Sequence, residues 1–102
     1  MWKGIFPAVT TKFTEGDELD VGEIERCFGL QFDAGCDGMI VCGSLGEAMA
    51  LEPEEKLELL GIAKSAAGTR PVLMTVCESS TKRAAKAAQA AAKAGADGLM
   101  VL

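Results

Sequence analysis

The chain has 102 residues, 49% of them hydrophobic, so it is long enough for one small globular domain with a buried core. Its net charge of −5 argues against a nucleic-acid partner, because no basic surface is present to neutralise phosphates. No apolar run approaches the roughly 18 residues of a membrane span, and the N-terminus lacks the apolar core of a signal peptide. We therefore expect a cytoplasmic protein with no membrane partner.

The first strand is predicted at residues 4–9, and later apolar runs predict three more. These runs are Met39–Cys42, Val72–Val76 and Leu99–Leu102. None alternates polar with apolar residues, and continuous apolar strands are typical of a parallel sheet covered on both faces.

The segments between the strands are predicted to be helical. Asp20 suits the N-cap of the first helix, with Glu23 as its capping-box partner. Pro53 suits the first position of the second helix, and Ser79 or Ser80 can cap the third.

A repeated sequence motif indicates the order of these strands and helices. The sequence Ala34–Val41 returns as Ala94–Val101, and Ala67–Met74 is a weaker copy between them. The copies are about 30 residues apart, which is the length of a βαβ unit. The order is therefore β-α-β-α-β-α-β. We interpret residues 1–102 as a single segment with three βα units and a fourth strand.

Two architectures fit this order, an open doubly wound sheet and a (β/α)₈ barrel. Both place functional residues at the C-terminal ends of the strands. A complete barrel needs about 200 residues or more, so this chain would be the N-terminal part of one. The alternatives are a small doubly wound domain or a non-catalytic barrel fragment, the latter prone to self-association through its open sheet edge.

One loop could carry chemistry. Gly43-Ser44-Leu45-Gly46-Glu47 follows the second strand and precedes a helix. The two glycines allow a tight turn whose N–H groups can hold a carboxylate or a phosphate, and Ser44 adds a hydroxyl. A plain βα turn explains the same residues equally well.

The chain resembles the dihydrodipicolinate synthase / N-acetylneuraminate lyase family. The resemblance is carried by residues 4–13, by Ile40–Glu47 with its Gly-Ser-x-Gly-Glu loop, and by Leu51–Lys56. It implies a (β/α)₈ barrel, usually a homotetramer, in which a lysine of the sixth strand forms a Schiff base with pyruvate or a related 2-keto acid. Aldol addition, cleavage or dehydration follows, without a metal or an organic cofactor.

The resemblance also implies roles for the loop residues. Ser44 would be catalytic, as part of a proton relay, and would contact the keto-acid carboxylate. The N–H group of Leu45 would bind the same carboxylate, and Gly43 and Gly46 would shape this substrate-binding loop. Glu47 would be structural.

Two single positions and one stretch of four residues depart from the family pattern. Leu45 stands where many members have a second threonine, and Lys12 stands where a proline is common. Residues 75–78 replace a glycine-rich stretch, so lysine-biosynthetic activity is a weaker expectation than membership of the family.

The Schiff-base lysine is expected beyond Leu102, because no lysine of this chain lies in an apolar strand run. On this interpretation the segment is inactive alone. The four cysteines, at positions 27, 36, 42 and 77, match no metal-binding or redox spacing and are expected to be reduced.

Overall fold

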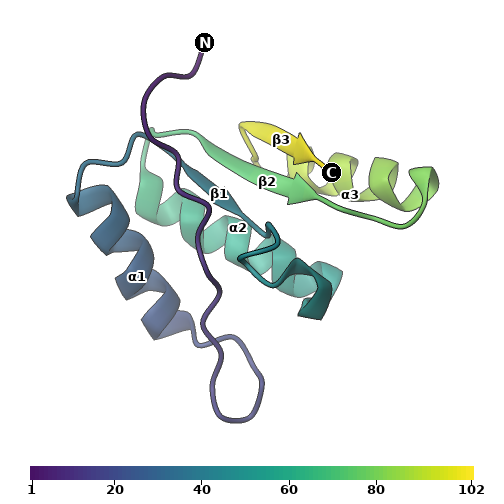
Figure 1. Cartoon of the computed structure of the whole chain (residues 1–102), viewed down its shortest axis with the longest axis horizontal. Helices are drawn as coiled ribbons and strands as arrows, with labels where there is room; N and C mark the ends of the chain where they lie inside the picture. Colours follow the sequence, from purple (N-terminus) through teal and green to yellow (C-terminus); the bar gives the residue numbers. More distant parts are fainter.

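The computed structural model describes residues 1–102 and contains three α-helices and a three-stranded sheet (Figure 1). The elements are α1 (Val21–Asp33), β1 (Met39–Val41), the 3-10 helix η1 (Ala48–Ala50), α2 (Pro53–Ala67), β2 (Val72–Val76), α3 (Thr81–Lys93) and β3 (Gly98–Val101). Three of the predicted strands and all three predicted helices are confirmed, with strand ends that differ by at most one residue. No helix is both long and apolar enough to cross a membrane.

The sheet is parallel, and its order β1-β2-β3 follows the chain. The N-terminal segment lies parallel beside β1, where the Val9 N–H donates to the Ile40 carbonyl at 3.1 Å and the Ile40 N–H donates to the Pro7 carbonyl at 2.9 Å. The parallel order and the sequential topology predicted from the repeat are therefore confirmed.

The predicted first strand at residues 4–9 is wrong in extent, because only an isolated bridge between Ala8 and Ile40 forms there. In a parallel ladder, the carbonyl of Gly38 would accept from the N–H of residue 7. Pro7 has no N–H to donate, so the ladder is interrupted. Gly4 adds a backbone φ of +98°, which lies outside the extended region.

The helices cover one face of the sheet. Helix α2 packs against β1 and β2, α3 packs against β2, and α1 packs against α2. Figure 1 shows α2 behind β1 and β2, with the N-terminal segment running beside β1. Successive right-handed crossovers in a sheet of sequential order place every helix on the same side. A doubly wound sheet would send one crossover to the other side, so this arrangement is that of a barrel wall.

The core lies between these helices and the sheet. It is a cluster of 15 buried residues, and its largest fully buried side chains are Phe28, Ile24, Met39, Leu59, Leu60, Val41, Val72 and Cys42. These side chains come from α1 and α2, from strands β1 and β2, and from Cys42 directly after β1. One contiguous core therefore fixes the direction in which β1 leads into the loop at residues 43–47.

The helix caps were largely predictable. Asp20 accepts a hydrogen bond from the Glu23 N–H at 3.2 Å, and Ser80, rather than Ser79, accepts from the Arg83 N–H at 3.2 Å. The predicted capping-box role of Glu23 is wrong. Its carboxylate instead accepts two hydrogen bonds from the Arg26 guanidinium, at 2.6 and 2.9 Å, which lowers the pKa of Glu23 to about 2.

The repeat has a structural explanation. The Asp37 carboxylate accepts from the N–H of Ile5 at 2.8 Å, and the Asp97 carboxylate accepts from the N–H of Val72 at 2.8 Å. Each aspartate thus binds the first residues of the preceding parallel segment. The middle copy has Arg70 at this position. The aspartate of the Asp-Gly motif therefore joins its own strand to the preceding parallel segment by a hydrogen bond, at the end of the sheet away from the loop.

Replacing Asp97 by asparagine is expected to lower the free energy of unfolding at pH 7 by about 1 kcal/mol, because it removes the ion pair with Lys64 Nζ, 2.7 Å away. The effect is small because the Asp97 side chain is 36% exposed, and water screens the pair. Burial raises the pKa of Asp97, but the hydrogen bonds from Lys64 and Val72 and the Lys64 charge outweigh it, so the pKa lies below its usual value. The contribution is therefore complete above the unfolded-state pKa of about 3.9 and is lost as the pH falls through the lower folded-state pKa. Urea unfolding at decreasing pH should show the two proteins converge, and a difference that does not depend on pH would contradict this assignment.

Candidate functional site

The loop at residues 43–47 begins where β1 ends, at the C-terminal edge of the parallel strands. Two residues with left-handed backbone conformation bracket it, Cys42 at φ +61° and Glu47 at φ +58°. Ser44 and Leu45 are exposed, whereas Gly43 and Gly46 are buried. The loop therefore presents the serine and the leucine to solvent and keeps both glycines against the protein.

Four consecutive backbone N–H groups of this loop, those of residues 43–46, make no hydrogen bond within the chain, and neither does the Ser44 hydroxyl. The turn itself is closed by later donors, because the Glu47 N–H donates to the Ser44 carbonyl at 3.1 Å and the Ala48 N–H donates to the Gly43 carbonyl at 3.2 Å. Successive unpaired N–H groups in a turn form a site for an anion. The predicted substrate-binding residues thus share one row of free donors.

Gly46 is held closely by its surroundings. A Cβ atom at this position would lie 3.1 Å from the Val9 carbonyl oxygen and 3.3 Å from the backbone nitrogen of Cys42. The buried Thr11 hydroxyl donates to the Gly46 carbonyl at 2.6 Å. The N-terminal segment therefore anchors the loop, and a side chain at Gly46 would crowd the backbone on both sides of it.

Two buried threonines adjoin the loop, and sequence patterns alone predicted no functional role for their hydroxyl groups. Thr11 and Thr75 are the buried polar residues of the chain, 7% and 3% exposed. Thr75 lies in β2, and its hydroxyl oxygen would be 3.5 Å from a Cβ atom on Gly43. A polar residue inside an otherwise apolar strand was the available signal.

The other reactive groups near the loop are unsuited to nucleophilic chemistry. Burial raises the pKa of the Cys42 thiol to about 11, although the nearby Lys56 charge opposes this, so the thiol stays protonated at neutral pH. Lys56 lies on α2 and pairs with Glu78 at 3.6 Å. No lysine of the chain lies on a strand, in agreement with the expectation from the sequence.

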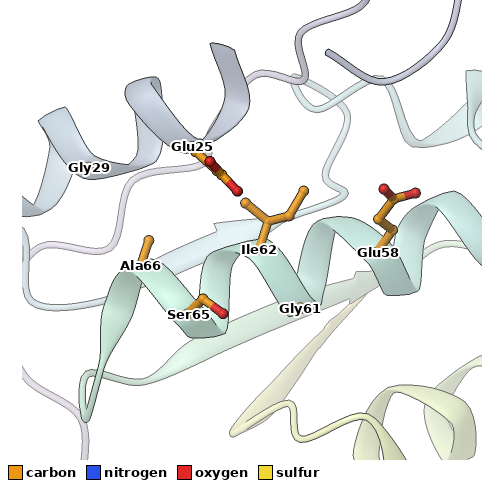
Figure 2. A pocket seen from close by; sticks show the side chains of 7 residues that line it. All are labelled: Glu25, Gly29, Glu58, Gly61, Ile62, Ser65 and Ala66. Atoms are coloured by element: carbon orange, nitrogen blue, oxygen red, sulfur yellow. The ribbon is translucent and has the colours of Figure 1, made fainter. Parts of the chain in front are cut away.

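A groove lies between α1 and α2 (Figure 2). Its lining includes the carboxylates of Glu25 and Glu58, together with Gly29 and Gly61. Its charged side chains are both acidic, so the groove repels an anionic ligand such as a keto acid. This groove is therefore a poorer candidate for an anion site than the loop at residues 43–46.

A parallel sheet with all helices on one side and a donor-lined loop at the strand ends defines the wall of a (β/α)₈ barrel, the class in which active sites form at that edge. The chain belongs to the Dihydrodipicolinate synthetase family, whose sequence model matches residues 1–102. The expected family and fold class are thus confirmed, and the chain corresponds to the N-terminal part of these proteins.

Individual relatives agree with this assignment. The chain is 35% identical to a 4-hydroxy-tetrahydrodipicolinate synthase of Kosmotoga olearia over 100% of its length and 35% of that protein. It resembles the structure of YagE, an E. coli K12 prophage protein of the dihydrodipicolinic acid synthase family in complex with pyruvate, with TM-score 0.90, 31% identity and coverage of 99% and 34%. It also resembles an N-acetylneuraminate lyase of Mycoplasma synoviae, with TM-score 0.85, 25% identity and coverage of 97% and 35%. The chain spans about a third of the length of these relatives.

Proposed function

We propose that the chain supplies the carboxylate-binding loop of a Schiff-base-forming lyase or synthase that acts on pyruvate or a related 2-keto acid. The observation that carries this proposal is the row of four unpaired N–H groups at residues 43–46, at the strand ends beside the Ser44 hydroxyl. The pyruvate complex of YagE, a structural relative, supports the choice of ligand.

The chemistry requires an amine that this chain does not supply from a strand. A lysine outside residues 1–102 condenses with the ketone of the keto acid, and the carbonyl oxygen leaves as water. The protonated imine accepts the electron pair of the adjacent carbon–carbon or carbon–hydrogen bond, as an electron sink for aldol chemistry. The loop fixes the carboxylate, and the Ser44 hydroxyl relays the proton to the departing oxygen.

Trapping with borohydride tests this proposal. A protein that carries residues 1–102 together with the remaining barrel is incubated with pyruvate and reduced. We expect one covalent adduct, of the mass of pyruvic acid less one oxygen atom, and peptide mapping should place it on a lysine outside residues 1–102. An absent adduct would contradict Schiff-base chemistry and favour a binding module that keeps only the anion loop. An adduct on one of the lysines of this chain would contradict the location of the nucleophile.

The family resemblance further supports a homotetramer in the cytoplasm, where its four free cysteines would stay reduced. Sedimentation of the same protein should therefore give the mass of a tetramer, and a monomer at micromolar concentration would contradict the assembly.

A further inference from the structure

The two buried threonines flank the loop from the two neighbours of β1. Thr11 belongs to the N-terminal segment on one side of β1, and Thr75 belongs to β2 on the other. The Thr11 hydroxyl is satisfied, because it donates to the Gly46 carbonyl at 2.6 Å. Thr75 as a residue is only 3% exposed, and its buried hydroxyl has no hydrogen-bond partner.

The position of Thr75 places this hydroxyl on the face of the sheet that the helices leave free. Met74 belongs to the core beneath the helices, and successive strand residues point to opposite faces. Thr75 pairs in register with Met100 of β3. A Cβ atom on Gly43 would lie 3.5 Å from the Thr75 hydroxyl oxygen and 4.0 Å from the Met100 methyl carbon. The hydroxyl therefore lies beside Gly43, the first residue of the free N–H row, and the Met100 methyl group is close to the same glycine.

What this place lacks is a hydrogen-bond acceptor. The N–H groups of residues 43–46 are unpaired donors, and the adjacent Thr75 hydroxyl is unpaired as well. A buried hydroxyl without a partner costs stability, and a valine of the same shape would avoid that cost. A carboxylate has two oxygen atoms with several lone pairs, enough to accept from the N–H groups and from a hydroxyl together.

We infer that Thr75 is a further substrate-binding residue, whose hydroxyl donates to the carboxylate of the keto acid held at residues 43–46. This inference rests on the proposed function. Leu45, 66% exposed and without a hydroxyl, cannot supply this bond.

The test compares Thr75→Val with Thr75→Ser in the complete protein that carries these residues, with Thr69→Val as the control because Thr69 is exposed in the turn before β2. Pyruvate affinity is measured by titration, and Tm is measured without ligand. For Thr75→Val we expect pyruvate binding to weaken by about 10-fold or more, with Tm unchanged or raised. Thr75→Ser should bind as the parent does, and Thr69→Val should change neither quantity.

Two results would overturn the inference. One is unchanged pyruvate affinity in Thr75→Val, and the other is equal loss in Thr75→Ser, which would show that the methyl group and not the hydroxyl matters. If Thr75→Val lowers Tm, the Thr75→Ser affinity alone decides. Failure of the proposed function has a different signature, because the parent protein itself would then give no borohydride adduct.

Discussion

Replacing Ser44 by alanine is expected to lower the turnover of the complete protein by about 100-fold while leaving its fold intact. The Ser44 side chain is exposed and makes no hydrogen bond within the chain, so its loss removes no stabilising contact. If the hydroxyl relays a proton during imine formation, its removal costs the typical factor of a lost proton-transfer group. Steady-state kinetics with pyruvate, together with a thermal unfolding curve, measure both effects.

Ser65→Ala is a matched control for this experiment. Ser65 is an exposed serine of α2 in the groove between α1 and α2, and that groove is lined by acidic side chains (Figure 2). Its replacement should leave turnover unchanged. Equal turnover for Ser44→Ala and the parent would reject the catalytic role of Ser44, whereas a lowered Tm would reveal a structural role that the contacts do not predict.

Replacing Phe28 by alanine is expected to lower the free energy of unfolding by about 3–5 kcal/mol, which is the usual cost of a cavity left by a buried aromatic ring. The Phe28 side chain is 1% exposed and is among the largest fully buried side chains of the core between the helices and the sheet. This loss is a large share of the roughly 5–15 kcal/mol that stabilises a typical domain. Urea unfolding monitored by circular dichroism measures it.

Leu30→Ala is the matched control on the same helix, because the Leu30 side chain is 51% exposed. We expect a change of about 0.5 kcal/mol or less for this variant. Comparable losses for the two variants would mean that the face of α1 carrying Leu30 is buried in the complete protein, and the assignment of the core to the α1–α2 and sheet contacts would need revision.

The sequence predicted the architecture well because its signals are local. The glycine that follows each helix has a positive φ, of +98° at Gly35, +63° at Gly68 and +96° at Gly95, as expected of helix C-termini. The apolar run Val72–Val76 became β2 with the same bounds. Each of these features depends on residues within one or two turns of each other, which a sequence displays directly.

The errors and omissions come from contacts that hydrophobic periodicity does not reveal, either between distant residues or between alternative local partners. The strand at residues 4–9 is interrupted by Pro7, whose missing N–H matters only because β1 lies alongside. The Glu23 side chain could accept a hydrogen bond either from the backbone N–H of Asp20, the N-cap residue, or from Arg26. It forms the bidentate pair with Arg26. The periodicity of apolar residues does not predict which residues far apart in the sequence become neighbours in space.

The candidate site shows the same division. Gly43, Ser44, Leu45 and Gly46 form one continuous segment, and the sequence singled them out together. Thr11 lies 35 positions before the Gly46 carbonyl that it binds, and the pattern of the sequence gave no sign of this bond. The fold and the family can be recognised from many residues together. The role of a single residue such as Thr11 depends on which atoms lie next to it in the folded chain.

The central claim is that the backbone N–H groups of residues 43–46 bind the carboxylate of a 2-keto acid. The most direct measurement is a crystal structure of the complete protein, reduced with borohydride in the presence of pyruvate. We predict carboxylate oxygens about 2.7–3.2 Å from the backbone nitrogens of this loop. A carboxylate bound at another part of the molecule, with these N–H groups still unpaired or bound only to water, would contradict the account.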